Sequence, residues 1–221
     1  MTEYNLYLDI ETIPTQSTIA WGDALAAVTA PGSYKKQESI DEWLAENRER
    51  VAREAIAKTS FDPAQGHICT ISWAAGDDDI TTAHAETVDQ EADVLRAFFG
   101  AMGDFDRPTF VGHYVGGFDL RFIICRAVVL GVPIPRGIPR DPKPWESRVF
   151  DTMQAWAGAK GTISMKNLAA ALGIPAKDDG FDGSQVAEAW ANGEHQRVAD
   201  YCAADVEAVR AIHKKFTAVN W

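Results

Sequence analysis

The sequence predicts an α/β fold, with a mixed five-stranded sheet and helices on both of its faces. Three observations carry this prediction. The first segment alternates apolar and polar residues, four later apolar segments are too short for helices, and the segments between and after them have helical periodicity. The chain has 221 residues, which is enough for one domain with an adequate core. We therefore expect a single domain over residues 1–221, with a helical insertion at about residues 15–63.

The first strand is expected at Tyr4 to Ile10, because every second residue there is apolar. Four more strands are expected at Ile68 to Ala75, Ile80 to Ala85, Thr109 to Gly112 and around Val149 and Phe150. Gly76 and the three aspartates after it form a turn signal, which predicts an antiparallel hairpin from the second and third strands. The order therefore predicts three antiparallel strands followed by two parallel ones.

The helices are expected between and after these strands. A helix from Asp89 to Met102 leads to the fourth strand, and a second one starts near Phe118 and stops at Gly131. The last helix, from His195 to Phe216, is long and contains neither Gly nor Pro. The remaining helices are expected at Thr152 to Ala159, Ser164 to Leu172 and Ser184 to Asn192.

The insertion separates the first two strands, which a tight turn would otherwise join. Ser39 and Glu42 have the spacing of a capping box, and the helix after them is expected to run to about Lys58. Its apolar side chains share one face, so we expect the helix to pack on the rest of the protein; they are Ile40, Trp43, Leu44 and Val51.

Composition excludes several classes of function. No apolar run approaches the roughly 20 residues of a membrane span, and the acidic, strand-like N-terminus is no signal peptide. Three widely spaced cysteines have no metal-site spacing, so we expect buried thiols in a reducing cytoplasm. The sequence also lacks the glycine-flanked serine of hydrolases and the glycine-rich phosphate loop with its lysine.

The charge is very uneven for a chain with a net charge of −11 and a pI near 4.8. Such acidity argues against tight nonspecific binding of nucleic acid, since that binding neutralises phosphates with Lys and Arg. Between Arg136 and Lys177, however, basic residues outnumber acidic ones. This local excess of positive charge favours a surface that guides a strand of nucleic acid. A chance fluctuation in charge on a solvated surface would give the same pattern.

Asp9 and Glu11 stand two residues apart on the first strand. They therefore share a face, with α-carbons roughly 6.6 to 7 Å apart. Two carboxylates so close repel each other unless a cation lies between them, and hard oxygen ligands suit Mg²⁺ or Mn²⁺. Taken alone, such a pair is more often two solvated acids at the end of a strand.

Two further segments carry acids in fitting contexts. Asp119 follows a Gly–Gly turn and lies in the first turn of the expected helix, where a helix-dipole role is the ordinary explanation. Tyr201 and Asp205 are four residues apart on the last helix, so they project side by side. A phenol there can hydrogen-bond an attacking water, but a packed tyrosine is the default.

The ordered set of motifs resembles the DEDD superfamily of 3′–5′ exonucleases, tyrosine subclass, which has the ribonuclease H-like fold. The segments LDIETIP, VGHYVGGFDLRF and ADYCAADVEAV are most similar to stand-alone relatives of the proofreading domains of family B DNA polymerases. The resemblance covers nearly the whole chain, including SMKNLAAALGIP and DGSQV. Asp200 occupies the position where the histidine subclass has its His, so that subclass is disfavoured.

The resemblance implies roles for five residues. Asp9, Glu11, Asp119 and Asp205 would be the metal ligands, and Tyr201 would orient the nucleophilic water. Two ions about 3.5 to 4 Å apart would bracket the terminal phosphodiester. One would be held by Asp9, Glu11 and Asp205, and the other by Asp9 and, through water, by Asp119.

Substrate contacts are expected nearby. The family often has Asn five residues before the second-motif Asp, whereas this chain has Tyr114, which would stack on a base or simply pack. Ile13 would wedge against the terminal base or belong to the core. The full expected set is Thr12, Ile13, Lys35, Lys36, His113, Tyr114 and Phe118. We expect the insertion to border the site, because it leaves the first strand directly after Glu11.

The expected function is a metal-dependent 3′–5′ exonuclease that releases nucleoside 5′-monophosphates from single-stranded DNA or frayed 3′ ends, with two Mg²⁺ or Mn²⁺ ions. Its partners would be the 3′ end of a single strand and a replication or repair protein, with no membrane. One alternative is an RNA 3′ exonuclease of the ribonuclease D type. Another is a catalytically silent nucleic-acid-binding subunit, which retention of all four acids and Tyr201 disfavours.

Overall fold

The computed structural model describes residues 4–102, 108–141, 148–158, 160–175 and 180–221. The chain divides into two compact units. The first consists of residues 1–11 and 68–221, and it contains all the acids of the predicted site and the whole sheet except Thr12, Ile13 and His67. The second consists of residues 12–67 and corresponds to the predicted insertion.

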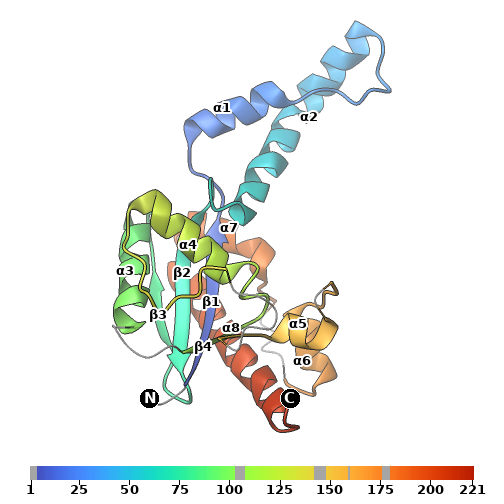
Figure 1. The fold of residues 1–221 in the computed structure, drawn as a ribbon. Helices are drawn as coiled ribbons and strands as arrows, with labels where there is room; N and C mark the ends of the chain where they lie inside the picture. The colour runs from blue at the N-terminus through green and yellow to red at the C-terminus, as the bar shows by residue number, and fades with distance from the viewer. Residues whose placement is uncertain (1–3, 103–107, 142–147, 159, 176–179) are drawn as a thin grey trace. The chain divides into compact units, whose positions relative to one another are not determined.

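The sheet has five strands in the order β3-β2-β1-β4-β5 (Figure 1). The strands are β1 (Asn5–Ile13), β2 (His67–Ala75), β3 (Thr81–His84), β4 (Thr109–Gly112) and β5 (Val149–Asp151). β4 pairs in parallel with β1 and with β5, and β2 and β3 form the predicted antiparallel hairpin. All five strands were predicted, but β1 continues past Ile10, so that both of its acids lie within the strand.

The helices also follow the prediction closely. They are α3 (Glu91–Met102), α4 (Asp119–Leu130), α5 (Thr152–Ala157), α6 (Met165–Ala171), α7 (Val186–Ala191) and α8 (His195–Thr217). Short 3₁₀ turns, Val88–Gln90 and Gly183–Gln185, replace the predicted starts of α3 and α7. Gly131 ends α4 in the left-handed conformation, with φ 65°. The predicted end of α5 at Ala159 lies outside the described residues.

Alternate residues of β1 enter two different cores. Leu6, Leu8 and Ile10 pack in the large core with α3 and α4. Tyr7 faces the other way, into a core that contains Val206 and Val209 of α8. Figure 1 shows α4 in front of the sheet and α8 behind it. By the two-residue period of a strand, Asp9 and Glu11 share the face of Tyr7, on the side of α8.

A buried ion pair joins α3 to α4. Nε and Nη2 of Arg126 each donate to a carboxylate oxygen of Glu91 at 2.7 Å, and both side chains are almost fully buried. Glu91 also accepts a hydrogen bond from the backbone N–H of Ile68 in β2. This contact depends on the tertiary fold, so the sequence alone could not show that Glu91 and Arg126 are partners.

The second unit contains α1 (Thr18–Ala27), α2 (Gln37–Ala57) and the 3₁₀ turn Lys58–Phe61. α1 was not predicted, and it packs against α2. The predicted capping box is wrong, because α2 begins at Gln37 and Ser39 lies inside it. Lys36 is the N-cap residue and makes no side-chain capping hydrogen bond. The helix ends one residue before the predicted Lys58.

Cys69 and Cys202 are buried free thiols, as predicted, and Cys125 is partly buried. Among the described helices, none combines the length and the apolar character that a membrane crossing requires.

Candidate active site

The site is built around the C-terminal half of β1. Ligand atoms of Asp9, Glu11 and Cys202 all lie within 4.8 Å of one another. The Cys202 thiol, on α8, lies 3.3 Å from the backbone oxygen of Asp9 and 3.5 Å from its Oδ2, and it donates to them. α8 therefore contacts the strand at the first of the two acids. Sequence reasoning had placed Cys202 in the core but had not assigned it to the site.

Asp119 reaches the same place from the other face of the sheet. The backbone N–H of Ile10, between the two β1 acids, donates to Oδ1 of Asp119 at 3.2 Å. Asp119 is the first residue of α4, and its side chain is buried. The turn before it is closed by the N–H groups of Gly117 and Phe118, which both donate to the carbonyl oxygen of Tyr114. This tight turn places the first residue of α4 next to Ile10 of β1.

Tyr201 and Asp205 lie four residues apart on α8, close enough for the Tyr201 hydroxyl to lower the pKa of the Asp205 carboxyl. The Tyr201 ring packs edge-on against Phe181, with the ring centroids 5.1 Å apart. The Arg197 guanidinium covers the Phe181 ring at 4.5 Å. Phe181 therefore holds the phenol in place from outside α8. No periodic pattern in the sequence pointed to Phe181, because it lies in a loop.

Burial raises the pKa values of all four carboxyl groups, and repulsion by the other site acids adds to the shift at Asp9 and Glu11. Burial raises the pKa of Asp119 to about 8, with Asp151 adding a repulsive charge. Burial raises the pKa of Asp205 to about 6, although the hydrogen bond from Tyr201 opposes the shift. The pKa values of Asp9 and Glu11 are raised well above the usual range by burial and then by the neighbouring acids. Four acids that resist ionisation together form a site that needs positive charge.

The donor set fits divalent metal ions. Carboxylate oxygens of Asp9 and Glu11 lie together on β1, Asp119 is bonded to the residue between them, and the charge of Asp205 acts on both. Hard oxygen ligands are the ones that Mg²⁺ and Mn²⁺ prefer. Burial and the nearby acids raise the pKa of the Cys202 thiol, so the thiol stays protonated and acts as a donor to Asp9. The mutual repulsion of the acids is what bound cations would relieve.

Asp151 is a further residue of this region that sequence reasoning missed. Its Oδ1 accepts the backbone N–H groups of Met153 and Gln154, which caps α5, and that of Tyr114 at 3.0 Å. Among the described residues its buried Oδ2 has no hydrogen-bond partner. The signal was available, because Asp151 directly precedes the predicted helix at Thr152, and Asp is a favoured N-cap residue.

The predicted substrate residues occupy different environments. Both ring nitrogens of His113 form hydrogen bonds, one with the Thr152 hydroxyl and one with the carbonyl oxygen of Ile163. His113 therefore links the end of β4 to α5 and to the segment before α6. Phe118 is half-buried against Phe122. Ile13 is only 1% exposed, which favours its core alternative. Tyr114 is exposed and has a positive φ of 63°.

Four predicted substrate residues lie in the second unit: Ile13, described above, and Thr12, Lys35 and Lys36. Thr12 donates its hydroxyl hydrogen to the carbonyl oxygen of Ser60 at 2.8 Å. Lys35 and Lys36 are exposed and directly precede α2.

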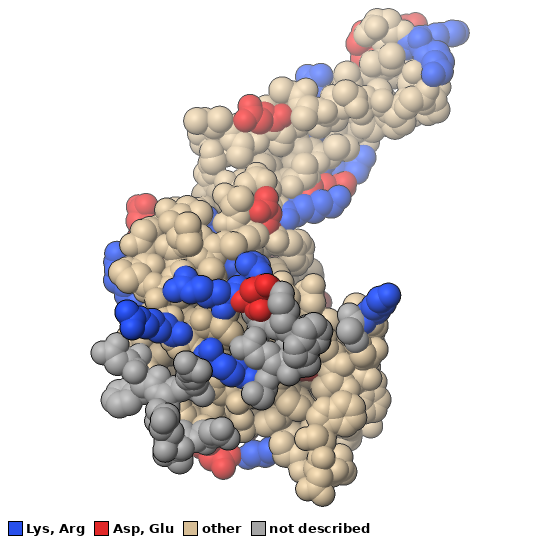
Figure 2. All heavy atoms as spheres, in the orientation of Figure 1, with Lys and Arg blue, Asp and Glu red and all other residues tan. Residues whose placement is uncertain are grey.

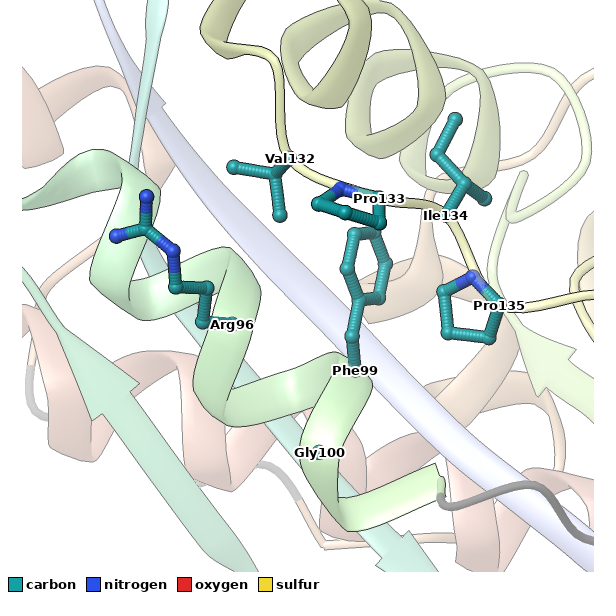
Figure 3. Close-up of a pocket in the computed structure, with 7 residues that line it drawn as sticks. All are labelled: Arg96, Phe99, Gly100, Val132, Pro133, Ile134 and Pro135. Atoms are coloured by element: carbon teal, nitrogen blue, oxygen red, sulfur yellow. The ribbon is translucent and has the colours of Figure 1, made fainter.

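One pocket of about 480 Å³ lies away from the acids (Figure 3). Figure 3 shows Phe99 of α3 facing Pro133 in the segment after α4, with Arg96 at one end. None of the predicted site residues lines it.

Basic side chains gather on one side of the sheet-containing unit. Figure 2 shows Lys and Arg side chains on the face that carries α3 and α4. Arg136 and Arg140, from the predicted basic segment, are exposed, whereas Arg148 is half-buried and donates to the carbonyl oxygen of Gly137. Lys143 and Lys177 lie outside the described residues.

A comparison with protein families agrees with this geometry. Residues 61–219 match a family described as a predicted 3′–5′ exonuclease related to the exonuclease domain of PolB. The chain belongs to this family. The matched residues include Asp119, Tyr201 and Asp205, whereas Asp9 and Glu11 precede them. This PolB-related chain is therefore a member of a 3′–5′ exonuclease family, as predicted from its motifs.

Solved structures support the same fold. The family B DNA polymerase from the hyperthermophilic archaeon Pyrobaculum calidifontis is similar over 98% of the chain, with a TM-score of 0.60 and 17% identity. The aligned part spans 25% of that polymerase. The mixed five-stranded sheet with helices on both faces is thus the ribonuclease H-like fold that was expected. No curated protein matches the chain.

Proposed function

We propose that this protein removes nucleotides from the 3′ end of single-stranded DNA, or of a frayed duplex, and releases nucleoside 5′-monophosphates. The observation that carries the proposal is the convergence of Asp9, Glu11 and Cys202 with Asp119, which is hydrogen-bonded to Ile10. Tyr201 and Asp205 complete the tyrosine-subclass arrangement on α8. The relation of the family to the PolB exonuclease domain favours DNA over RNA.

Four carboxylates would hold two divalent ions, Mg²⁺ or Mn²⁺. Asp9, Glu11 and Asp205 would hold one ion, and Asp9 together with Asp119 would hold the other. Bound ions of this kind supply Lewis-acid stabilisation of the phosphodiester and of the leaving 3′ oxygen.

The protein's own groups then set the geometry of attack. The Tyr201 hydroxyl, beside Asp205, positions the nucleophilic water in line with the terminal phosphate. The Cys202 thiol holds Asp9 in position by donating to the backbone oxygen and to Oδ2 of Asp9.

The test is digestion of end-labelled single-stranded DNA and RNA, side by side, with Mg²⁺, with Mn²⁺ and with EDTA. The proposal expects a ladder shortening from the 3′ end of DNA, 5′-mononucleotide products and no reaction in EDTA. A 3′-terminal phosphate should block the reaction, while a 5′ modification should not. Faster digestion of RNA would favour the ribonuclease alternative, and binding without cleavage under every metal condition would favour the silent subunit.

A further inference from the structure

The turn between β4 and α4 contains an unusual residue. Tyr114 has a φ of 63°, in the left-handed region that side chains other than Gly, Asn and Asp rarely adopt. Among the described residues, the other non-glycine position with positive φ is Asn220, a residue type that tolerates it. A bulky aromatic residue in this conformation is strained, and such strain collects at functional sites.

The surroundings fix Tyr114 in this conformation. Its N–H donates to Oδ1 of Asp151 at 3.0 Å, and its carbonyl oxygen accepts from Gly117 at 3.1 Å and from Phe118 at 2.9 Å. The ring lies against Gly117, where an added methyl group would overlap it. The aromatic ring is therefore placed on the backbone two residues before Asp119.

Packing does not explain the strain. The Tyr114 side chain is 44% exposed, so the ring is not required to fill the core. Asn would adopt the same backbone conformation with less strain. What Tyr supplies and Asn does not is a partly exposed aromatic ring with π-faces, held against Gly117 in the turn before a site carboxylate. Bases of single-stranded nucleic acid bind such faces by stacking, largely without regard to base identity.

We propose that Tyr114 is a stacking platform for one base near the 3′ end of an unpaired strand. This inference rests on the proposed function and narrows its substrate to nucleic acid that carries an intact, unstacked base at that position. Tyr114 acts on binding, so its loss raises KM more than it lowers kcat.

The test compares wild type with Tyr114→Asn and Tyr114→Phe on DNA oligonucleotides, intact or with a single abasic site at each of the last four positions. For intact DNA, Tyr114→Asn is expected to raise KM by about 5- to 150-fold, as expected for one lost base stack. Its Tm should rise, since Asn relieves the strain. Tyr114→Phe should restore most of the affinity. When the abasic site replaces the base that stacks on Tyr114, wild type and Tyr114→Asn should have similar KM values, because neither protein can then form the stack.

A second variant displaces the ring without removing it. Gly117→Ala should raise KM in the wild-type background, because its methyl group moves the Tyr114 ring, and should raise it much less in the Tyr114→Asn background. Equal KM values for wild type and Tyr114→Asn on intact DNA would overturn the inference, as would an equal loss on abasic and intact DNA at every position. Both of these outcomes require an active wild-type protein. Failure of the proposed function is a different result, in which the wild type itself cleaves no 3′ end.

Discussion

The backbone N–H of Ile10 donates a hydrogen bond to Oδ1 of Asp119, across 109 residues of sequence. Ile10 lies between Asp9 and Glu11, so this bond fixes the start of α4 against the strand that carries the other acids. It also keeps one oxygen of Asp119 occupied and directs the carboxylate into the cluster. The bond explains how acids from opposite faces of a sheet reach one site.

This arrangement predicts a pH-dependent stability in the absence of metal. The folded-state pKa values of Asp119, about 8, and Asp205, about 6, exceed the unfolded value of about 4. Folding therefore favours the protonated acids, and their stabilisation is present at low pH and is lost as the pH rises through these values. In EDTA, we expect the Tm to fall between pH 5 and pH 8. Mg²⁺ should raise the Tm most at pH 8.

Asp119→Asn is the matched control for this prediction. Asn keeps an oxygen that can accept from Ile10 but carries no charge. Thermal unfolding of the variant should therefore show a smaller fall from pH 5 to pH 8 and a smaller effect of Mg²⁺. Parallel pH profiles for the two proteins would contradict the assignment of this pH dependence to Asp119.

Removal of a metal ligand should abolish catalysis while the fold survives. We expect Asp9→Ala or Asp205→Ala to lower the cleavage rate by at least about 10³-fold, since ligand loss removes several kcal/mol of transition-state stabilisation. Repulsion among the remaining acids should also decrease, so the Tm in EDTA should not fall. Asp200→Ala is the control, because Asp200 is exposed on the same helix and bonds to Gln196. Comparable turnover by Asp9→Ala and wild type would contradict the two-metal mechanism.

Tyr201→Phe should slow cleavage without abolishing it. The hydroxyl positions water and holds no metal, so we expect a loss of about 10- to 100-fold in kcat. Phe keeps the ring contact with Phe181, so circular dichroism melting should give a similar Tm. An unchanged kcat would show that the hydroxyl is idle and that Tyr201 only packs.

The buried pair of Glu91 and Arg126 makes a prediction about stability. Arg126→Leu leaves the Glu91 carboxylate buried with no guanidinium beside it, which should lower the free energy of unfolding by about 3 to 5 kcal/mol. Urea denaturation measures this loss. Adding Glu91→Leu should recover part of it, but not all, since the N–H of Ile68 then loses its acceptor. A double variant less stable than Arg126→Leu would contradict the ion-pair explanation.

The sequence predicted most elements of the first unit because local patterns determine them. Alternation identified β1, and Gly131 identified the end of α4. The sequence could not identify contacts that depend on the tertiary fold, such as those of Cys202 with Asp9 and of Phe181 with Tyr201. In the insertion, α1 was missed because its residues lack an amphipathic pattern, and none of them is buried.

The last prediction concerns Lys35 and Lys36. Both lysines are exposed, and we expect them to contact phosphates of a single-stranded substrate. Replacing both by Gln should raise KM and lower the slope of log KM against log salt, by about 1.4 for two phosphate contacts on a single strand, with little change in kcat.

The control is the equal charge change at Lys214 and Lys215 near the end of α8, where Lys214 is already paired with Asp77. Single-stranded and blunt duplex substrates should be compared at low and high salt. If the Lys35 and Lys36 variant matches wild type in KM at both salt concentrations, the insertion does not guide the strand. If both double variants change KM equally, the effect reflects net charge rather than a path over the insertion.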